Sequence, residues 1–145
     1  MTSRDPTAAD LERSSERWLA WLARETARRQ HRPESALQAL WDALDEWLAS
    51  DEFAASVVAA AVVAPPDGRG PAAHEALIRH RRATRRLLEG LARSAGARDP
   101  AALAGQLLIL VEGAIAGTLI DRHATAARHG RELTHLALAA SVAHG

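Results

Sequence analysis

Residues Asp99 to Asp121 read DPAALAGQLLILVEGAIAGTLID, which is the pattern of a helix with almost no polar face. Asp99 is a suitable N-cap, and Pro100 suits the first helical position, where its missing N–H costs nothing. On a helical wheel the large aliphatic side chains surround the whole circumference, whereas a surface helix would gather them in one stripe. We therefore expect a helix that is buried on every side.

The length of this stretch allows two environments, a lipid bilayer and the interior of a protein. About 20 apolar residues are enough to span a bilayer. Glu112 stands near the middle, where an acidic residue costs roughly 2.5–3.5 kcal/mol on insertion scales. Gly113 and Gly117 have a spacing that lets the backbone of another helix approach closely. We expect no membrane span, but a helix with one face on its own core and another on a partner chain.

The composition is that of one domain with balanced charge. The chain has 145 residues, no cysteine, and 18 basic and 18 acidic residues. The lack of cysteine excludes disulfides and thiolate metal sites and, together with the lack of a secretory signal, favours a cytoplasmic protein. DNA-binding domains normally carry a basic excess that neutralises phosphates. We expect no specific DNA binding by this chain alone.

The rest of the chain also reads as helices separated by short links. Helical patterns cover residues 5–30, 33–48, 50–63, 71–95, 99–121 and 124 onward. Asp5 is suited to begin the first, Pro33 the second and Ser50 the third. The one long break is PPDGRGP at 65–71, which predicts an exposed loop. Without strand alternation or an internal repeat, the sequence predicts an all-α fold, a six-helix bundle.

The segment from Arg79 to Ile120 carries a specific order of signals. A basic amphipathic helix is followed by a stop at Gly96, a restart at Asp99 and an apolar helix around Glu-Gly-Ala at 112–114. This order resembles the C-terminal effector-binding and dimerisation domain of TetR-family transcriptional regulators.

The resemblance extends from about Pro33 to Ala140. It implies a connecting helix in residues 1–32 and a TetR-like ligand-binding and dimerisation domain in residues 33–145. Two features of the family are absent: the short motif with Cys and Asn that follows the position of Phe53, and the N-terminal helix-turn-helix head.

The resemblance also implies a homodimer. Its last two helices would pair with those of a second copy in a four-helix interface. The expected interface residues are Gln106, Ile109, Leu110, Gly113, Ala114, Gly117, Leu133, Leu136, Ala137 and Ala140.

His80 and Thr84 share the inward face of the helix at 71–95 with leucines. Buried polar groups need partners, and two interpretations stay open. Both side chains could bond to neighbouring backbone, Thr84 to the carbonyl one turn back. Alternatively, they could orient a small apolar effector in a mostly apolar cavity. The expected wall of that cavity is Trp41, Leu44, Phe53, Val57 and Leu108.

Catalysis and metal binding have little support in the sequence. No two histidines stand three or four residues apart, as a helix-borne zinc site requires, and no phosphate loop or nucleophile elbow is present. Glu112 is interpreted as a structural hydrogen-bonder, and the run of arginines from Arg79 to Arg86 as a solvated face offset by Glu75 and Glu89. We expect a protein that is not an enzyme and needs neither cofactor nor metal.

The sequence therefore favours a small-molecule-sensing, homodimerising domain of TetR type that lacks its own DNA-binding head. The alternative is a stand-alone helical dimer that acts as a structural or protein-interaction module without a ligand. A large cavity between Trp41 and His80 would favour the sensor, and a filled core would favour the module.

Overall fold

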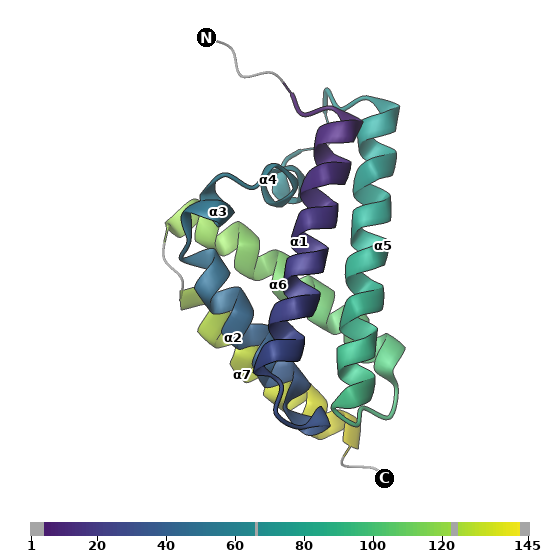
Figure 1. Ribbon diagram of the computed structural model, residues 1–145, viewed down its shortest axis with the longest axis vertical. Coiled ribbons are helices and arrows are strands. Elements are labelled where there is room, and N and C mark those ends of the chain that lie inside the picture. Colours follow the sequence, from purple (N-terminus) through teal and green to yellow (C-terminus); the bar gives the residue numbers. More distant parts are fainter. Residues whose placement is uncertain (1–4, 66, 123–124, 143–145) are drawn as a thin grey trace.

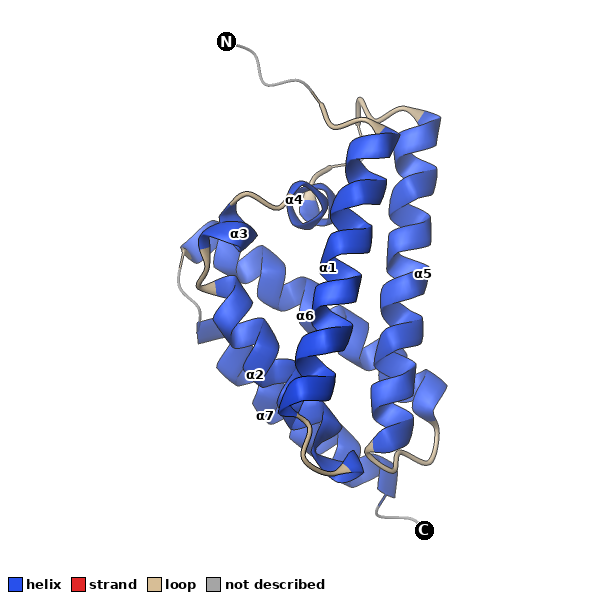
Figure 2. Cartoon of the chain, in the orientation of Figure 1, coloured by secondary structure: helices blue, strands red, loops and turns tan. Residues whose placement is uncertain are grey.

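The computed structural model describes residues 5–65, 67–122 and 125–142, and within these ranges it contains helices and no strand (Figures 1 and 2). The predicted all-α class is confirmed. The elements are α1 (Ala8–Arg29), a short 3₁₀ turn (Pro33–Ser35), α2 (Ala36–Leu48), α3 (Asp51–Ala54), α4 (Val57–Val63), α5 (Pro71–Ser94), α6 (Pro100–Asp121) and α7 (Thr125–Val142).

The predicted single helix at 50–63 is wrong, because the chain divides there into α3 and α4. Ser50 caps α3 by accepting a hydrogen bond from the N–H of Phe53 (3.3 Å). Ser56 has an extended backbone and begins α4 by accepting from the N–H of Ala59 (3.2 Å). A serine side chain that competes for backbone N–H groups favours a helix start over a helix interior. The described residues thus form seven α-helices rather than six.

The start of α1 also differs from the prediction. Thr7, not Asp5, is the N-cap, and it forms a reciprocal capping box with Asp10. The start near Ala124 that was predicted for the last helix lies outside the described residues.

The boundaries around α6 agree with the prediction. Asp99 accepts from the N–H of Ala102 (3.1 Å) and Pro100 is the first helical residue. Gly96, with φ of 89°, follows the end of α5 in the left-handed conformation that glycine adopts without strain.

The helices pack around a main core and a smaller second core. α1 lies beside α5 and α2, α6 crosses behind them, and α7 packs along α6 and α2 (Figure 1). The main core joins α2, α5 and α6 and contains Leu40, Trp41, Leu44, Leu88, Leu103 and Leu107. A smaller core joins the other end of α1 to α4 and α5 and contains Leu11, Val58, Ala61, Ala76 and Leu77.

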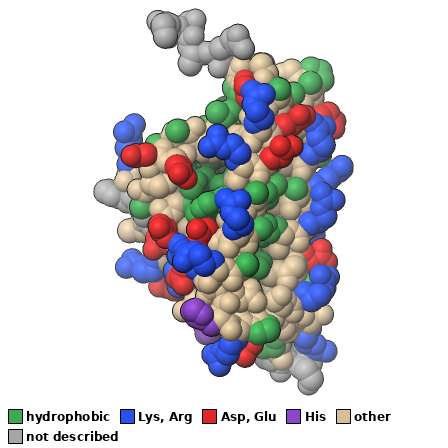
Figure 3. Space-filling model, in the orientation of Figure 1, with side chains coloured by type: hydrophobic (Ala, Val, Ile, Leu, Met, Phe, Trp, Pro, Cys, Tyr) green, Lys and Arg blue, Asp and Glu red, His purple; other side chains and the backbone are tan. Residues whose placement is uncertain are grey.

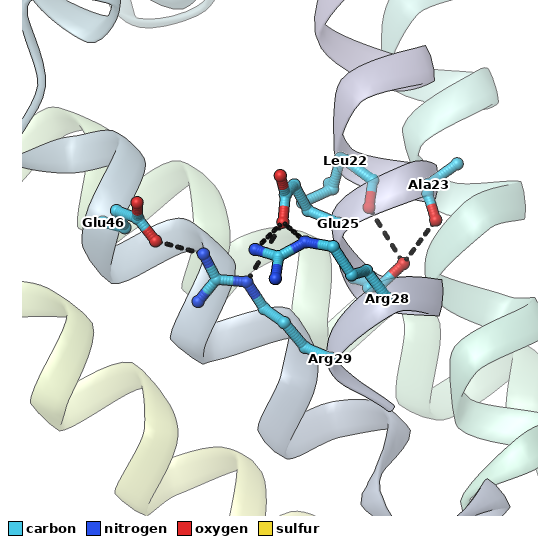
Figure 4. A network of polar contacts seen from close by, with 7 residues as sticks. Leu22, Ala23, Glu25, Arg28, Arg29 and Glu46 are labelled. Carbon is cyan, nitrogen blue, oxygen red and sulfur yellow. Dashed lines mark hydrogen bonds and ion pairs between the residues drawn. The ribbon is translucent and has the colours of Figure 1, made fainter. Parts of the chain in front are cut away.

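An ion-pair network holds the end of α1 against α2 (Figure 4). Arg29 bonds both to Glu25 on its own helix and to Glu46 on α2. Arg28 adds a second contact to Glu25 at 2.7 Å and, as the main cause, lowers the pKa of that carboxyl. Glu46 is exposed, so solvent screens this network and it orients the helices more than it stabilises them.

Candidate functional site

His80 lies in the interior with a polar partner from another helix. Its Nδ1 is hydrogen-bonded to the hydroxyl of Ser15 on α1 at 2.7 Å, and its ring packs against Trp18 with centroids 5.6 Å apart. Burial lowers the pKa of His80 from 6.5 to about 4. The imidazole is therefore neutral at pH 7 and serves to join α5 to α1.

Thr84 bonds to the backbone one turn earlier on α5. Its hydroxyl donates to the carbonyl of His80 at 2.8 Å. This contact confirms the predicted bond of Thr84 to the carbonyl one turn back, whereas the partner of His80 is the Ser15 hydroxyl and not a backbone group.

Trp41 faces α7. Its indole N–H donates to the hydroxyl of Thr134 at 2.8 Å, and the side chain is 0% exposed. The ring lies against Gly130, where an added Cβ would come within 2.3 Å of Cη2. Trp41 packs on α7 and His80 packs on α1, so the two side chains take part in different helix–helix contacts. A glycine inside a helix is the one sequence signal of this contact, because it lets the Trp41 ring approach the backbone of α7.

Three of the other residues predicted to form the cavity wall belong to the same core as Trp41, and Val57 does not. Leu44 and Leu108 belong to the main core, and Phe53 packs edge-on against Trp47 with centroids 4.8 Å apart. Val57 is 38% exposed and lies along a surface groove beside α1.

A second groove, of about 700 Å³, runs between α6 and α7. Six of the residues predicted for the dimer interface line it, namely Gln106, Ile109, Leu110, Leu133, Ala137 and Ala140. Ile109 is 68% exposed, and Leu136, on the neighbouring surface of α7, is 64% exposed. The structure therefore brings most of the predicted interface together on one solvent-facing surface.

Two of the predicted interface residues face their own chain. Ala114 is 4% exposed and belongs to the main core. Gly117 is directed at the start of α7, since an added Cβ would lie 3.6 Å from the Cβ of Ala126. Gly113 has open space beside it. The helix is thus not buried on every side within one chain, and in this turn Gly113 faces outward whereas Ala114 faces the core.

The exposed side of α6 forms a regular stripe. Its members are spaced by four and three residues in alternation, and they are Ala102, Gln106, Ile109, Gly113, Ala116 and Ile120. None of them carries a charge. We refer to these six residues as the α6 stripe. Alternating spacings of four and three keep one seam of a helix directed at a neighbouring helix.

Two arginines of α5 are paired with acidic residues of neighbouring helices. Arg81 bonds Glu112 of α6 through two contacts of 2.7 and 2.9 Å, which confirms Glu112 as a structural hydrogen-bonder. Arg79 bonds Glu12 of α1 at 2.6 Å in place of the i,i+4 partner Glu75. The arginine run is solvent-exposed and partly neutralised, mainly by other helices.

The groove beside α1 was not predicted. It has a volume of about 840 Å³ and lies between α1 and the segment that includes α3 and the start of α4. Figure 3 shows this face, with hydrophobic side chains exposed between α1 and α3–α4 and charged side chains around them. Trp18, Trp21 and Trp47 line it, together with Arg17 and Arg24. Most of its lining residues come from α1, but Trp47, Glu52 and Val57 come from other helices, so spacing along one helix does not define the groove.

Among the described residues, no three His, Asp or Glu side chains are grouped as a metal site would need. By length and composition α6 could cross a membrane, with a mean hydropathy of 1.8 over its most apolar window, of which 44% is buried inside the fold. Comparison of the chain with protein-family models, curated proteins and solved structures found no match.

Proposed function

We propose that this chain is a homodimerisation module in which α6 and α7 pair with α6 and α7 of a second copy. The observation that carries the proposal is the α6 stripe, an uncharged and regularly spaced seam on the outside of the fold. The surface of α6 and α7 also exposes large apolar side chains, namely Ile109 and Ile120 of the stripe and Leu136 of α7. Contiguous exposed apolar surface of this kind marks interaction sites.

The chemistry of the stripe favours a second copy over an unrelated partner. A two-fold interface places the same patch on both chains, so a patch with charges of one sign would repel its copy. The α6 stripe has no charge, and Gly113 and Ala116 allow close approach of two helices. Burial of each large aliphatic side chain contributes roughly 1.5–3 kcal/mol, so a few such residues from each copy are enough to oppose the entropy lost on association.

The TetR resemblance implies two functions, dimerisation and effector binding, and this role is the first of them. We extend the proposal to a TetR-type C-terminal domain because α5, the stop at Gly96, the restart at Asp99 and the apolar α6 occur in the expected order. The effector half of the resemblance gains no support around Trp41 and His80, where the contacts are those of a filled core. The homodimerising module without an internal effector cavity is therefore the better-supported form of the proposal.

Light scattering behind a sizing column tests the dimer. The wild-type chain should elute at twice its 15.5 kDa mass at tens of micromolar. Ile109→Arg should give a folded monomer, because it puts a guanidinium into the seam at a position that is 68% exposed in one chain. Val63→Arg on α4 is the matched control, since Val63 is an exposed aliphatic residue outside the stripe, and it should remain dimeric.

A monomeric wild type would end the proposal. So would an Ile109→Arg variant that stays dimeric with an unchanged circular-dichroism spectrum. A lipid surface is the alternative partner for the α6 stripe, and flotation of the wild type with liposomes tests it. A wild-type monomer that binds vesicles, and loses this binding in Ile109→Arg, would show that the stripe contacts lipid and not a second copy.

A further inference from the structure

We infer that the groove beside α1 is a binding site for a small aromatic carboxylate. The groove uses no residue of the α6 stripe, so the inference is independent of dimerisation. Its volume of about 840 Å³ falls in the range of small-molecule sites.

One wall of the groove is aromatic and held in place. The rings of Trp18 and Trp47 lie 5.4 Å apart and those of Trp21 and Trp47 lie 6.4 Å apart, all in tilted orientations. Phe53 packs on the edge of Trp47 and fixes it from the other side. Trp18 and Trp47 are buried and Trp21 is half-buried, so a flat ligand would meet the exposed part of Trp21 on a rigid support. Offset and edge-to-face contacts with aromatic rings are favourable for such a ligand.

Trp18 has an unmet hydrogen-bond donor. Its side chain lines the groove and is 7% exposed, yet its Nε1 has no hydrogen-bond partner in the part of the chain that the structure describes. Buried indole N–H groups usually have an acceptor, and an unpaired one is unfavourable. The Nε1 atom is itself covered by the protein, so a ligand in the groove would meet the accessible part of the Trp18 ring and would reach this donor only if neighbouring side chains moved.

Two arginines supply charge on the same side. Arg17 and Arg24 stand four residues before and three residues after Trp21, so all three share one face of α1. Neither has an ion-pair partner among the described residues, whereas Arg13 is paired with Asp10 at 2.8 Å. Guanidinium groups bind carboxylates through paired hydrogen bonds and also stack on aromatic rings.

Acidic residues limit the charge of the ligand. Glu16, Glu52 and Asp10, which is paired with Arg13, also line the groove, so its rim is balanced overall. Glu52 is in the first turn of α3, where the helix dipole offsets part of its charge. A single carboxylate can lie between Arg17 and Arg24, but a phosphate ester or a polyanion would meet these two glutamates. The site is therefore suited to a planar aromatic ligand with one negative charge.

Titration with 2-naphthoate, followed by ¹H–¹⁵N NMR, tests the site. The chain has four tryptophans, so the indole N–H region holds few signals, which Trp→Phe variants assign. We expect 2-naphthoate to shift the Trp18 and Trp21 signals. The Trp41 signal is an internal control and should stay in place, because that indole is hydrogen-bonded to Thr134 in the α2–α7 contact.

Ligand and protein variants give matched controls. The neutral 2-naphthamide should bind at least about tenfold more weakly, and so should 2-naphthoate to the Arg17→Gln/Arg24→Gln variant, because each loses a charge-assisted contact. Arg28→Gln removes an arginine of the same helix that does not line the groove, and it should leave the affinity unchanged.

Three results would overturn the inference. One is the absence of shifts at Trp18 and Trp21 at millimolar 2-naphthoate. Another is equal binding of the acid and the amide, which would indicate a merely apolar groove. The third is tighter binding of 2-naphthylmethylamine, which would assign the groove to cations through Glu16 and Glu52. Light scattering of the same samples reports dimerisation separately, so either proposal can fail while the other stands.

Discussion

Trp41 and Gly130 set the distance between α2 and α7 at the level of single atoms. The indole ring occupies the space that a side chain at residue 130 would need, because an added Cβ would come within 2.3 Å of Cη2 and 2.5 Å of Cζ3. The same indole donates a hydrogen bond to Thr134, one turn further along α7. One tryptophan thus holds α7 by packing and by a polar contact.

Gly130→Ala should therefore destabilise the fold, although alanine is the better helix former. Relief of the clash would require Trp41 or α7 to move, and overpacking of this kind costs about 1–3 kcal/mol. Gly90→Ala on α5 is the control, since an added Cβ there meets nothing within 4 Å. It should stabilise by roughly 0.5–1 kcal/mol through helix propensity alone. Urea unfolding of both variants measures the difference, and changes of equal sign and size would contradict the role given to Gly130.

His80 makes stability depend on pH. Burial lowers its pKa from 6.5 to about 4, with a smaller opposing effect from the Glu112 carboxylate and a lowering one from Arg81. Between these two pH values the unfolded chain binds the proton and the folded chain does not, so the free energy of unfolding decreases as the pH falls. The contribution is complete above about pH 6.5 and is lost towards pH 4, with a size of at most about 3 kcal/mol.

His80→Gln should remove this part of the pH dependence. Glutamine does not titrate, so the decrease in unfolding free energy between about pH 6.5 and pH 4 should become shallower than in the wild type. His135→Gln, at an exposed position of α7, should keep the wild-type slope. His80→Ala should in addition cost about 1–3 kcal/mol at pH 7, because the hydroxyl of Ser15 loses its partner. Urea titrations at a series of pH values test all three variants, and an unchanged slope in His80→Gln would refute the assignment.

At the scale of the element, sequence signals that act within one or two turns were reliable. Asp99 and Pro100 begin α6, and Gly96 follows the end of α5, because caps and left-handed residues depend on the adjacent backbone alone. The same kind of signal was present but overlooked at Thr7 and Ser56. Both serve as N-caps, and the first has its capping-box partner three residues on.

The face that each helix presents was harder to predict. α6 is apolar around its circumference, so its sequence could not distinguish the side that its own chain covers from the side that stays exposed. Ala114 was assigned to the outer side and lies in the core, whereas Ala102 and Ala116 complete the α6 stripe. The pairing of Trp41 with Gly130 and the groove beside α1 both join residues that are far apart in the sequence. Such contacts depend on how the helices cross and not on spacing along one helix.

At the scale of the whole molecule, α5 connects the two proposed binding surfaces. It packs against α1 on one side and α6 on the other. Arg79 bonds Glu12 of α1, and Arg81 bonds Glu112 of α6. Two arginines of the run from Arg79 to Arg86 therefore join helices, and the chain as a whole has no net charge.

This use of the arginines predicts weak DNA binding without sequence preference. At physiological salt, gel-shift titration against random genomic fragments should show only low affinity that decreases further as salt is raised. The combined change Glu12→Gln and Glu89→Gln frees Arg79 and Arg93 from their partners, which lie at 2.6 and 3.2 Å. That variant should bind all fragments somewhat more tightly and with a steeper salt dependence, because more arginines can then contact phosphates. Selection from the same fragments is the decisive measurement: one sequence that the wild-type chain binds at nanomolar strength would show that the α5 arginines form a DNA-reading surface after all.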